Sequence, residues 1–338
     1  GSALAPRLGV FLAERLRRAL AAGGRAVLGD DAVEGALSTG GWRDGPEEAT
    51  LVEAARRSAA SSIVHGAVDW GDRLSIRLRT WPGPAEGHAE DAPAEIWRTF
   101  ESAAAPVLAA LGVRSLEPGP RPPIEAVEAV LAARAAWEAR DWARVREEAG
   151  RARASSPDWD DPLEVLGGAL AAAGEGREAS RVWAELADRA QARGERDRAS
   201  DCLLEAARAR RVAGDLEATI ALLAESAALA ATPSVELRPR LMRSEFLRQA
   251  GRDPEAISEA RLALSAVRGS GREEAAARFC LGVALGKTDR AASAIELGRA
   301  IEGFASAGDI DGVARVARSL GPHVDSDPAA ASIRRALA

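Results

Sequence analysis

The stretch Gly174-Glu175-Gly176-Arg177-Glu178-Ala179 is followed by an apolar helical run over residues 182–186. The same arrangement, a short turn before a helix, begins 34 residues earlier at Arg140 (174 − 140) and 40 residues later at Gly214 (214 − 174). Repeats of this length are helical hairpins, which cannot bury their apolar faces alone and must stack on their neighbours. The pattern therefore predicts a stacked helical array, which offers surface for binding rather than chemistry.

The composition is that of a soluble globular protein, with 47% apolar and 28% charged residues among 338. The formal net charge is −6, and the acidic residues are interspersed with arginine, which argues against general nucleic-acid binding by this chain. The two cysteines lie far apart without CxxC spacing, so they indicate buried thiols rather than a disulfide or zinc framework. No apolar stretch approaches the length of about 20 residues that spans a bilayer.

The chain begins Gly1-Ser2 with no methionine, as a cleaved purification tag would leave it. We therefore expect the natural protein to continue upstream of Ala3. The predicted location is cytoplasmic, with an extracytoplasmic location as the alternative if an upstream transmembrane segment has been removed.

A proline-rich segment at residues 116–123 cannot be helical and marks a boundary. The predicted division is an α/β domain at 3–115, a linker at 116–124 and a repeat domain at 125–338. The linker is compatible with either a stiff spacer or a packed strap.

The region before the prolines mixes helical and strand patterns. Helices are predicted at 8–22, 32–37, 49–61 and 94–111, and a short strand at 25–28. Residues 62–70 and 74–81 alternate in polarity across the turn Gly71-Asp72, which is typical of a β-hairpin. The predicted fold class is therefore mostly α, with a small α/β domain followed by an α-solenoid of helical hairpins.

Two runs in this region resemble the small α/β domain of the TolB-amino-terminal/FlgO-like group. They are Ala60-Ser61-Ser62-Ile63-Val64-His65-Gly66-Ala67-Val68 and Gly71-Asp72-Arg73-Leu74-Ser75-Ile76-Arg77-Leu78. The opening strand of that group is missing here. The resemblance covers about residues 5–113 and implies a non-catalytic domain beside helical repeats in a bacterial signalling protein.

The hairpin region resembles tetratricopeptide repeats. A unit from Ala126 places the small residue Ala133 where two helices cross, and a unit from Asp160 places Gly167 there. Looser units begin at residues 200, 237 and 275. We expect five hairpins, and a final helix at about 328–337 that caps the stack.

By this resemblance, the first helix of each repeat lines a concave groove, and that groove is the predicted peptide-binding site. The candidate residues are Arg134, Trp137, Glu138, Arg208, Arg211, Arg238, Glu245 and Arg248. Arginine-rich lining would suit an acidic peptide, because guanidinium groups bind carboxylates through two parallel hydrogen bonds. The alternative interpretation is that arginine is simply the default basic residue of a GC-rich genome, since the chain has a single lysine, Lys287.

No arrangement of residues predicts catalysis, a metal site or a cofactor. His65, His88 and His323 have no partner spacing for a metal or a catalytic triad. Residues 282–288 resemble a phosphate-binding loop, but they have three residues rather than four between the glycines and follow a helix rather than a strand.

The sequence thus predicts a non-enzymatic scaffolding or sensory module of a larger bacterial signalling protein, which binds a protein or peptide, with an acidic segment as one candidate. Two alternatives are the effector-sensing half of a transcriptional regulator and the regulatory tail of a Ser/Thr kinase.

Overall fold

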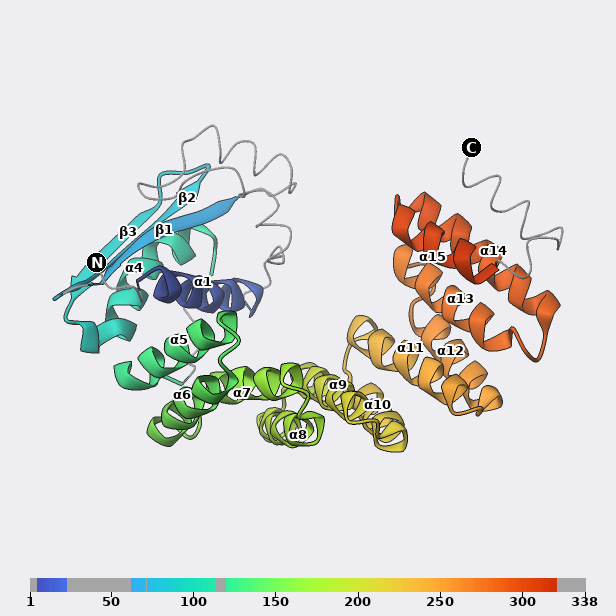
Figure 1. Cartoon of the computed structure of the whole chain (residues 1–338). Helices are drawn as coiled ribbons and strands as arrows, with labels where there is room; N and C mark the ends of the chain where they lie inside the picture. Colours follow the sequence, from blue (N-terminus) through green and yellow to red (C-terminus); the bar gives the residue numbers. More distant parts are fainter. Residues whose placement is uncertain (1–4, 23–61, 71, 114–119, 321–338) are drawn as a thin grey trace. The chain divides into compact units, whose positions relative to one another are not determined.

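The computed structural model describes residues 5–22, 62–70, 72–113 and 120–320 (Figure 1). The chain divides into two compact units, residues 1–162 and 163–338. The first unit holds α1 (Ala5–Ala22), β1 (Ile63–Trp70), β2 (Leu74–Trp81), β3 (Glu86–Asp91), the 3-10 turn η1 (Pro93–Glu95), α4 (Ile96–Ala110), α5 (Ile124–Glu138) and α6 (Trp142–Ser155).

The three strands form an antiparallel sheet in the order β1-β2-β3. Alternation along β2 buries Leu74 and Ile76 on one face, as the period of two in a strand requires. Helix α1 packs on β1, α4 packs on β2 and β3, and the two helices contact each other (Figure 1). Gly87 permits the close approach of α4, because a Cβ there would lie 1.8 Å from the carbonyl oxygen of Ala103. The opposite face of β2 and β3 is polar, with exposed Arg77 and His88.

The sequence prediction of this region was incomplete. It found the β1–β2 hairpin and the helices now seen as α1 and α4, but it missed strand β3. That strand reads Glu-Gly-His-Ala-Glu-Asp, and Gly87 is its one fully buried residue, so it lacks the apolar alternation that marks strands. The predicted elements at 25–28, 32–37 and 49–61, and the predicted capping helix at 328–337, lie outside the described residues.

The described end of the proline segment packs as a strap. The carbonyl oxygen of Pro120 accepts a hydrogen bond from Arg15 of α1, at 3.0 Å. The carbonyl oxygen of Pro122 accepts one from the indole Nε1 of Trp97 in α4, at 2.8 Å. Both bonds join the segment before α5 to the α/β region, so residues 120–122 act as a packed strap rather than a free spacer.

Aromatic contacts join α5 and Trp159, in the segment after α6, to helices α1 and α4 of the first unit. The ring of Phe11 meets Trp97 edge-on at 6.0 Å between centroids and Trp159 at 5.9 Å. The guanidinium groups of Arg15 and Arg134 each lie 5.8 Å from the Phe11 centroid. Such ring pairs and cation–π contacts stabilise the packing beyond the area that they bury.

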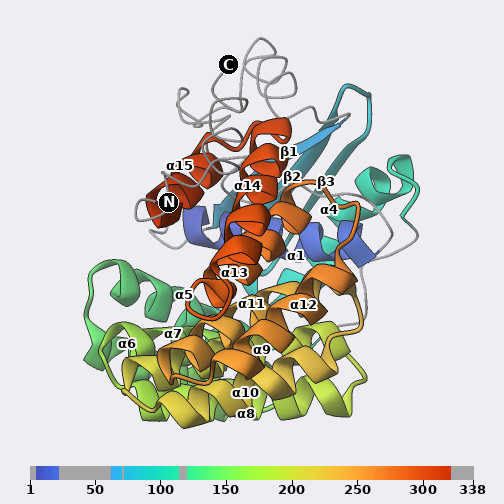
Figure 2. The ribbon, with the colours of Figure 1, turned by 90° about the vertical axis from the view of Figure 1, so that its right-hand side faces the viewer.

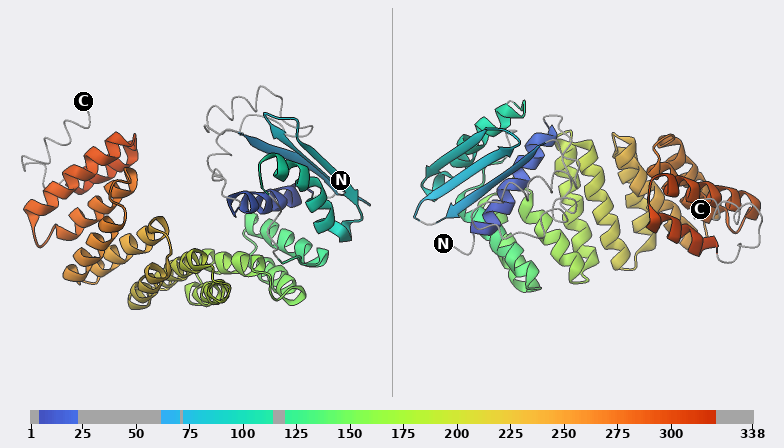
Figure 3. Two further views of the ribbon diagram at one scale, coloured as in Figure 1. Left: turned by 180° about the vertical axis from the view of Figure 1, so that it is seen from behind. Right: turned by 90° about the horizontal axis from the view of Figure 1, so that it is seen from above.

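The second unit continues the hairpins (Figure 2, Figure 3). Its helices are α7 (Asp161–Ala172, which begins at the unit boundary), α8 (Gly176–Ala192), α9 (Arg196–Val212), α10 (Leu216–Leu229), α11 (Pro233–Gln249), α12 (Asp253–Ala266), α13 (Arg272–Leu285), α14 (Arg290–Ser306) and α15 (Ile310–Leu320). Neighbouring helices along the chain contact each other from α8 to α15. The described residues therefore form the tetratricopeptide-like hairpins α5–α6, α7–α8, α9–α10, α11–α12 and α13–α14, followed by the helix α15.

The repeated turns that the sequence predicts all end a helix with a residue of positive φ. Gly174, Gly214 and Gly251 have φ of 83°, 75° and 76°, the left-handed region in which glycine meets no steric penalty. Asp215 then begins the next helix, since its carboxylate accepts a hydrogen bond from the Ala218 amide. In the first hairpin Arg140 takes the glycine position with φ of 57°. The turn thus keeps its geometry even where its residue type changes.

Candidate protein-binding face on helices α9 and α11

Three of the predicted groove residues lie on α5 in the first unit. Arg134 has its guanidinium beside the Phe11 ring and 3.6 Å from the Asp161 carboxylate. The Trp137 ring meets Trp142 edge-on at 5.9 Å. These two side chains therefore take part in packing within the first unit, a role that the sequence did not indicate for Arg134.

The other five lie on α9 and α11, two first helices of consecutive hairpins that contact each other. We call their surface the α9–α11 face. It consists of Asp201, Glu205, Arg208, Arg211, Arg238, Glu245 and Arg248. The structure thus brings Arg208 and Arg211 together with Arg238, Glu245 and Arg248, and adds two acidic residues that were not predicted.

Asp201 anchors one end of the face. Burial raises the pKa of its carboxyl group, and the positive charges of Arg238 and Arg208 oppose that shift. Asp201 stands one turn before Glu205 and two turns before Arg208, which places all three on one side of α9. Asp201 could have been assigned to the face from the sequence, because it has in α9 the position that Arg238 has in α11, 37 residues later (238 − 201).

The other end of the face centres on Glu245. Its carboxylate accepts hydrogen bonds from Nε of Arg248 at 3.0 Å, from the same guanidinium's terminal nitrogen at 2.7 Å, and from Gln249 at 2.9 Å. Burial alone would raise the pKa of Glu245, but these hydrogen bonds and the charge of Arg211 lower it. Glu245 therefore stays ionised at neutral pH.

Arg211 projects from α9 toward the same end. Its guanidinium carbon lies 5.3 Å from the ring centroid of Phe246, a buried residue of α11. A guanidinium that rests on an aromatic ring keeps its N–H donors directed outward in the ring plane. Arg211 and Arg238 are exposed, and the guanidinium group of neither forms a hydrogen bond with a residue that the structure describes.

The charges of the face sum to a small positive value. Four arginines stand against three carboxylates, whereas the whole chain carries −6. A local excess of guanidinium on an acidic protein favours contact with an acidic surface.

Outside the α9–α11 face, the described ranges give the surroundings of the other groups that could carry chemistry. No group of three or more His, Cys, Asp or Glu there could hold a metal ion. Burial raises the pKa of the Cys280 thiol to about 11, so the unreactive thiol form dominates at neutral pH. Gly282, from the loop-like segment 282–288, lies inside α13, where a Cβ would be 2.7 Å from Leu297. It serves close helix packing.

Of the helices that the structure describes, none combines the length and the apolar character needed to cross a membrane. Neither a family model nor a curated protein matches the sequence.

Several solved structures resemble the chain at low identity. BtubC (BKLC) from P. vanneervenii is 17% identical over 58% of this chain and 87% of its own, with a TM-score of 0.42. A thermophilic TPR protein of Thermus thermophilus is 18% identical over 58% and 98%, with a TM-score of 0.36. The apo form of RapI is 10% identical over 72% and 92%, with a TM-score of 0.40. Scores this low do not establish a common fold, so the assignment of tetratricopeptide-like hairpins depends on the chain's own turns and packing.

Proposed function

We propose that this protein is a non-catalytic interaction module, and that the α9–α11 face binds an acidic segment of another protein or a peptide. The first helices of the hairpins supply the contact residues, and the second helices support them. Binding needs no cofactor, because guanidinium and carboxylate groups supply the recognition.

The observation that carries the proposal is the arrangement of arginines on two adjacent helices. Arg211 and Arg238 are exposed and keep their donors available, and Arg211 is oriented by the ring of Phe246. A guanidinium held in place before binding loses less conformational freedom when it meets a carboxylate. An excess of such groups on one face of an acidic chain is the feature that an acidic partner would recognise.

The wider context is also a proposal. The sequence of residues 5–113 resembles the TolB-amino-terminal/FlgO-like domain, which favours a place in a larger bacterial signalling protein in the cytoplasm. The division into an α/β domain at 3–115, a linker at 116–124 and repeats at 125–338 belongs to the same proposal.

The test is affinity capture from a lysate of the source organism with identification by mass spectrometry. The bait is the full chain, beside a variant with Arg211→Glu and Arg238→Glu. The matched control reverses two exposed arginines on second helices of the same unit, Arg181→Glu and Arg261→Glu. All baits are checked for the same helical circular dichroism.

We expect at least one protein to bind the wild type and the control and to be lost from the Arg211→Glu, Arg238→Glu variant. Equal recovery on all three baits would reject the α9–α11 face as the binding site.

A further inference from the structure

The α9–α11 face already contains the kind of group that an acidic partner would bring. Glu245 holds Arg248 through two hydrogen bonds, and Glu205 holds Arg208 at 2.5 Å within the same helix. Both are i,i+3 pairs on partly exposed side chains. Two of the four arginines are therefore occupied by carboxylates of the chain itself.

The free energy that an incoming carboxylate gains differs between arginines already bonded to a glutamate of the chain and arginines without such a bond. At Arg248 it must first displace Glu245, and exchanging one surface ion pair for another changes the free energy little. At Arg211 and Arg238 it breaks no hydrogen bond between side chains of the described residues, so each new contact adds to affinity, reduced by the nearby charges of Glu245 and Asp201.

Glu245 has a second effect, because it lies within the electrostatic reach of two helices. It faces Arg248 on its own helix and Arg211 on α9, and Gln249 holds its carboxylate from the next turn. The neutral thiol of Cys280 lies within range of its charge. The carboxylate thus reduces the positive field of both arginines, whereas Glu205 is paired with Arg208 alone among the face's arginines.

We infer that Glu245 acts as an internal competitor for acidic segments at the α9–α11 face. It favours densely acidic partners: a segment with one carboxylate gains a single contact, at Arg211 or Arg238, whereas a segment with several neighbouring carboxylates reaches both and also displaces Glu245 from Arg248. This inference rests on the proposed function, and it assigns to Glu245 the selection of densely acidic partners.

The experiment measures fluorescence anisotropy of labelled peptides with the full-length chain at low and at physiological salt. One peptide alternates glutamate with alanine, and the matched peptide has glutamine in place of every glutamate. The variants are Glu245→Gln, Arg211→Gln and the double variant Glu245→Gln, Arg248→Gln.

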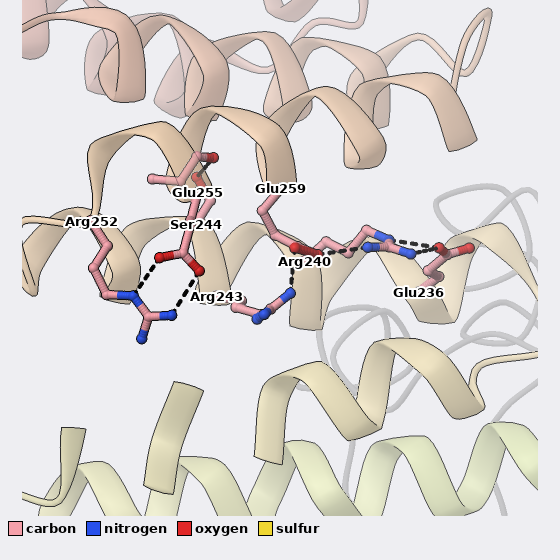
Figure 4. A network of polar contacts seen from close by, with 8 residues as sticks. Glu236, Arg240, Arg243, Ser244, Arg252, Glu255 and Glu259 are labelled. Atoms are coloured by element: carbon pink, nitrogen blue, oxygen red, sulfur yellow. Dashed lines mark hydrogen bonds and ion pairs between the residues drawn. The ribbon is translucent and has the colours of Figure 1, made fainter. Parts of the chain in front are cut away.

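The control variant is Glu255→Gln. Glu255, in the first turn of α12, also forms a two-bond i,i+3 pair with Arg252, at 2.7 Å for both bonds (Figure 4). Neither residue belongs to the α9–α11 face, and Arg252 has a second partner in Glu217 at 3.2 Å. This control changes the net charge by the same amount as Glu245→Gln. It therefore separates a local effect from a general one.

Glu245→Gln is expected to lower the Kd for the glutamate peptide about two- to fivefold, the range that a surface ion pair contributes. Glu255→Gln should leave that Kd unchanged, the double variant should cancel the gain, and the glutamine peptide should bind none of the proteins measurably. The gain should shrink at higher salt, since the charges are partly exposed.

An unchanged Kd for Glu245→Gln, or an equal gain with Glu255→Gln, would overturn the inference. If Arg211→Gln still weakened binding in that case, the proposed function would survive without it. Absence of glutamate-peptide binding by every variant would also overturn the inference, and the affinity capture would then decide the proposed function separately.

Discussion

Two consecutive hairpins, α9–α10 and α11–α12, have the same geometry but opposite placement of polar groups. The turn glycines of the two hairpins are 37 residues apart (251 − 214), so residues at this offset occupy corresponding positions. At several of these positions one hairpin has an apolar side chain and the other a polar one. In α9–α10, Leu203 and Leu222 belong to one apolar cluster. The corresponding residues of α11–α12 are Arg240 and Glu259, which form an ion pair at 2.6 Å (Figure 4).

At the neighbouring layer of residues the polar pair is in α9–α10 and the apolar pair is in α11–α12. In α9–α10 the buried hydroxyl of Ser200 donates to the carbonyl of Ser226 at 2.8 Å, and the Ser226 hydroxyl donates back to the carbonyl of Ser200. The corresponding Leu237 and Ala263 of α11–α12 share an apolar cluster. Each hairpin therefore has one polar and one apolar layer between its helices, in opposite order.

The polar layer of α11–α12 is an extended network. Glu259 is buried and accepts hydrogen bonds from Arg240 and Arg243, and Arg240 also bonds Glu236 (Figure 4). The next hairpin repeats the pattern, with Arg278 bonded to Glu296 at 2.9 Å. The repeat geometry thus fixes which positions are interior and leaves their polarity open, provided that each buried charge is paired.

The largest effect is expected where a buried charge loses its partner. Glu259→Leu copies Leu222 of the preceding hairpin but leaves Arg240 and Arg243 without their shared carboxylate, so it should destabilise the fold by about 3 kcal/mol. Urea unfolding followed by circular dichroism measures the loss. Glu255→Leu, which removes one of the two exposed carboxylates bonded to Arg252 and leaves Glu217, should cost less than about 1 kcal/mol.

Adding Arg240→Leu to Glu259→Leu should recover part of that loss, because it removes one of the two guanidinium groups that lost Glu259; the recovery stays partial, since Arg240 keeps its bond to Glu236 and Arg243 remains. If Glu259→Leu costs no more than Glu255→Leu, the pairing in α11–α12 does not stabilise the hairpin.

The apolar counterpart should respond through packing. Leu203→Ala removes a buried side chain from its cluster and should cost about 2 kcal/mol, through lost burial and the cavity that remains. The same unfolding assay applies, with Leu262→Ala on the exposed side of α12 as the control. Equal losses at the two leucines would contradict the placement of Leu203 in the interior.

The hydrogen bonds between Ser200 and Ser226 should contribute less to the free energy of unfolding than the burial of Leu203. Ser200→Ala removes two contacts of one hydroxyl, to the carbonyl and to the hydroxyl of Ser226, and should cost about 1 kcal/mol. Ser265→Ala serves as the control, because the Ser265 hydroxyl is exposed and bonds only within its own helix. A Ser200→Ala protein as stable as this control would show that the buried bonds add nothing net.

The smallest expected effect is a difference between α9 and α11 in how their local stability changes at low pH. The pKa of Glu245 in α11 is lowered from 4.5, so its contribution is present above that value and is lost as pH falls through the folded-state pKa. The pKa of Asp201 in α9 is raised, so protonation relieves a cost of burial there. Hydrogen exchange, corrected for its intrinsic pH dependence, should show α11 losing protection relative to α9 below about pH 4.5. The reverse order would contradict these two shifts.

The hairpins could be predicted from the sequence because their ends depend on local residues. Gly174, Gly214 and Gly251 require positive φ, and Asp215 caps the helix that follows. The Arg240–Glu259 pair could not be predicted, since its members are 19 residues apart across a turn and charged residues on a helix normally face water. Its interior location depends on packing that no single helix reveals.

The candidate site, too, could be predicted from the sequence only in part. The grouping of Arg208, Arg211, Arg238, Glu245 and Arg248 on two adjacent helices followed from repeat spacing, and their role in binding stays a prediction. The packing of Arg134 against Phe11 could not be foreseen, because Phe11 lies 123 residues earlier (134 − 11) in another type of domain. Contacts between distant segments remain invisible to periodicity.

The most direct test of the proposed binding face is site-specific photo-crosslinking in a lysate of the source organism. A photoreactive phenylalanine derivative replaces Val212, an exposed residue next to Arg211 on α9, or Leu262, an equally apolar exposed residue on the second helix α12. We predict a crosslinked partner at position 212 that disappears with Arg211→Glu, and none at position 262. Crosslinking at 262 alone, or equally at both positions, would contradict binding through the first helices.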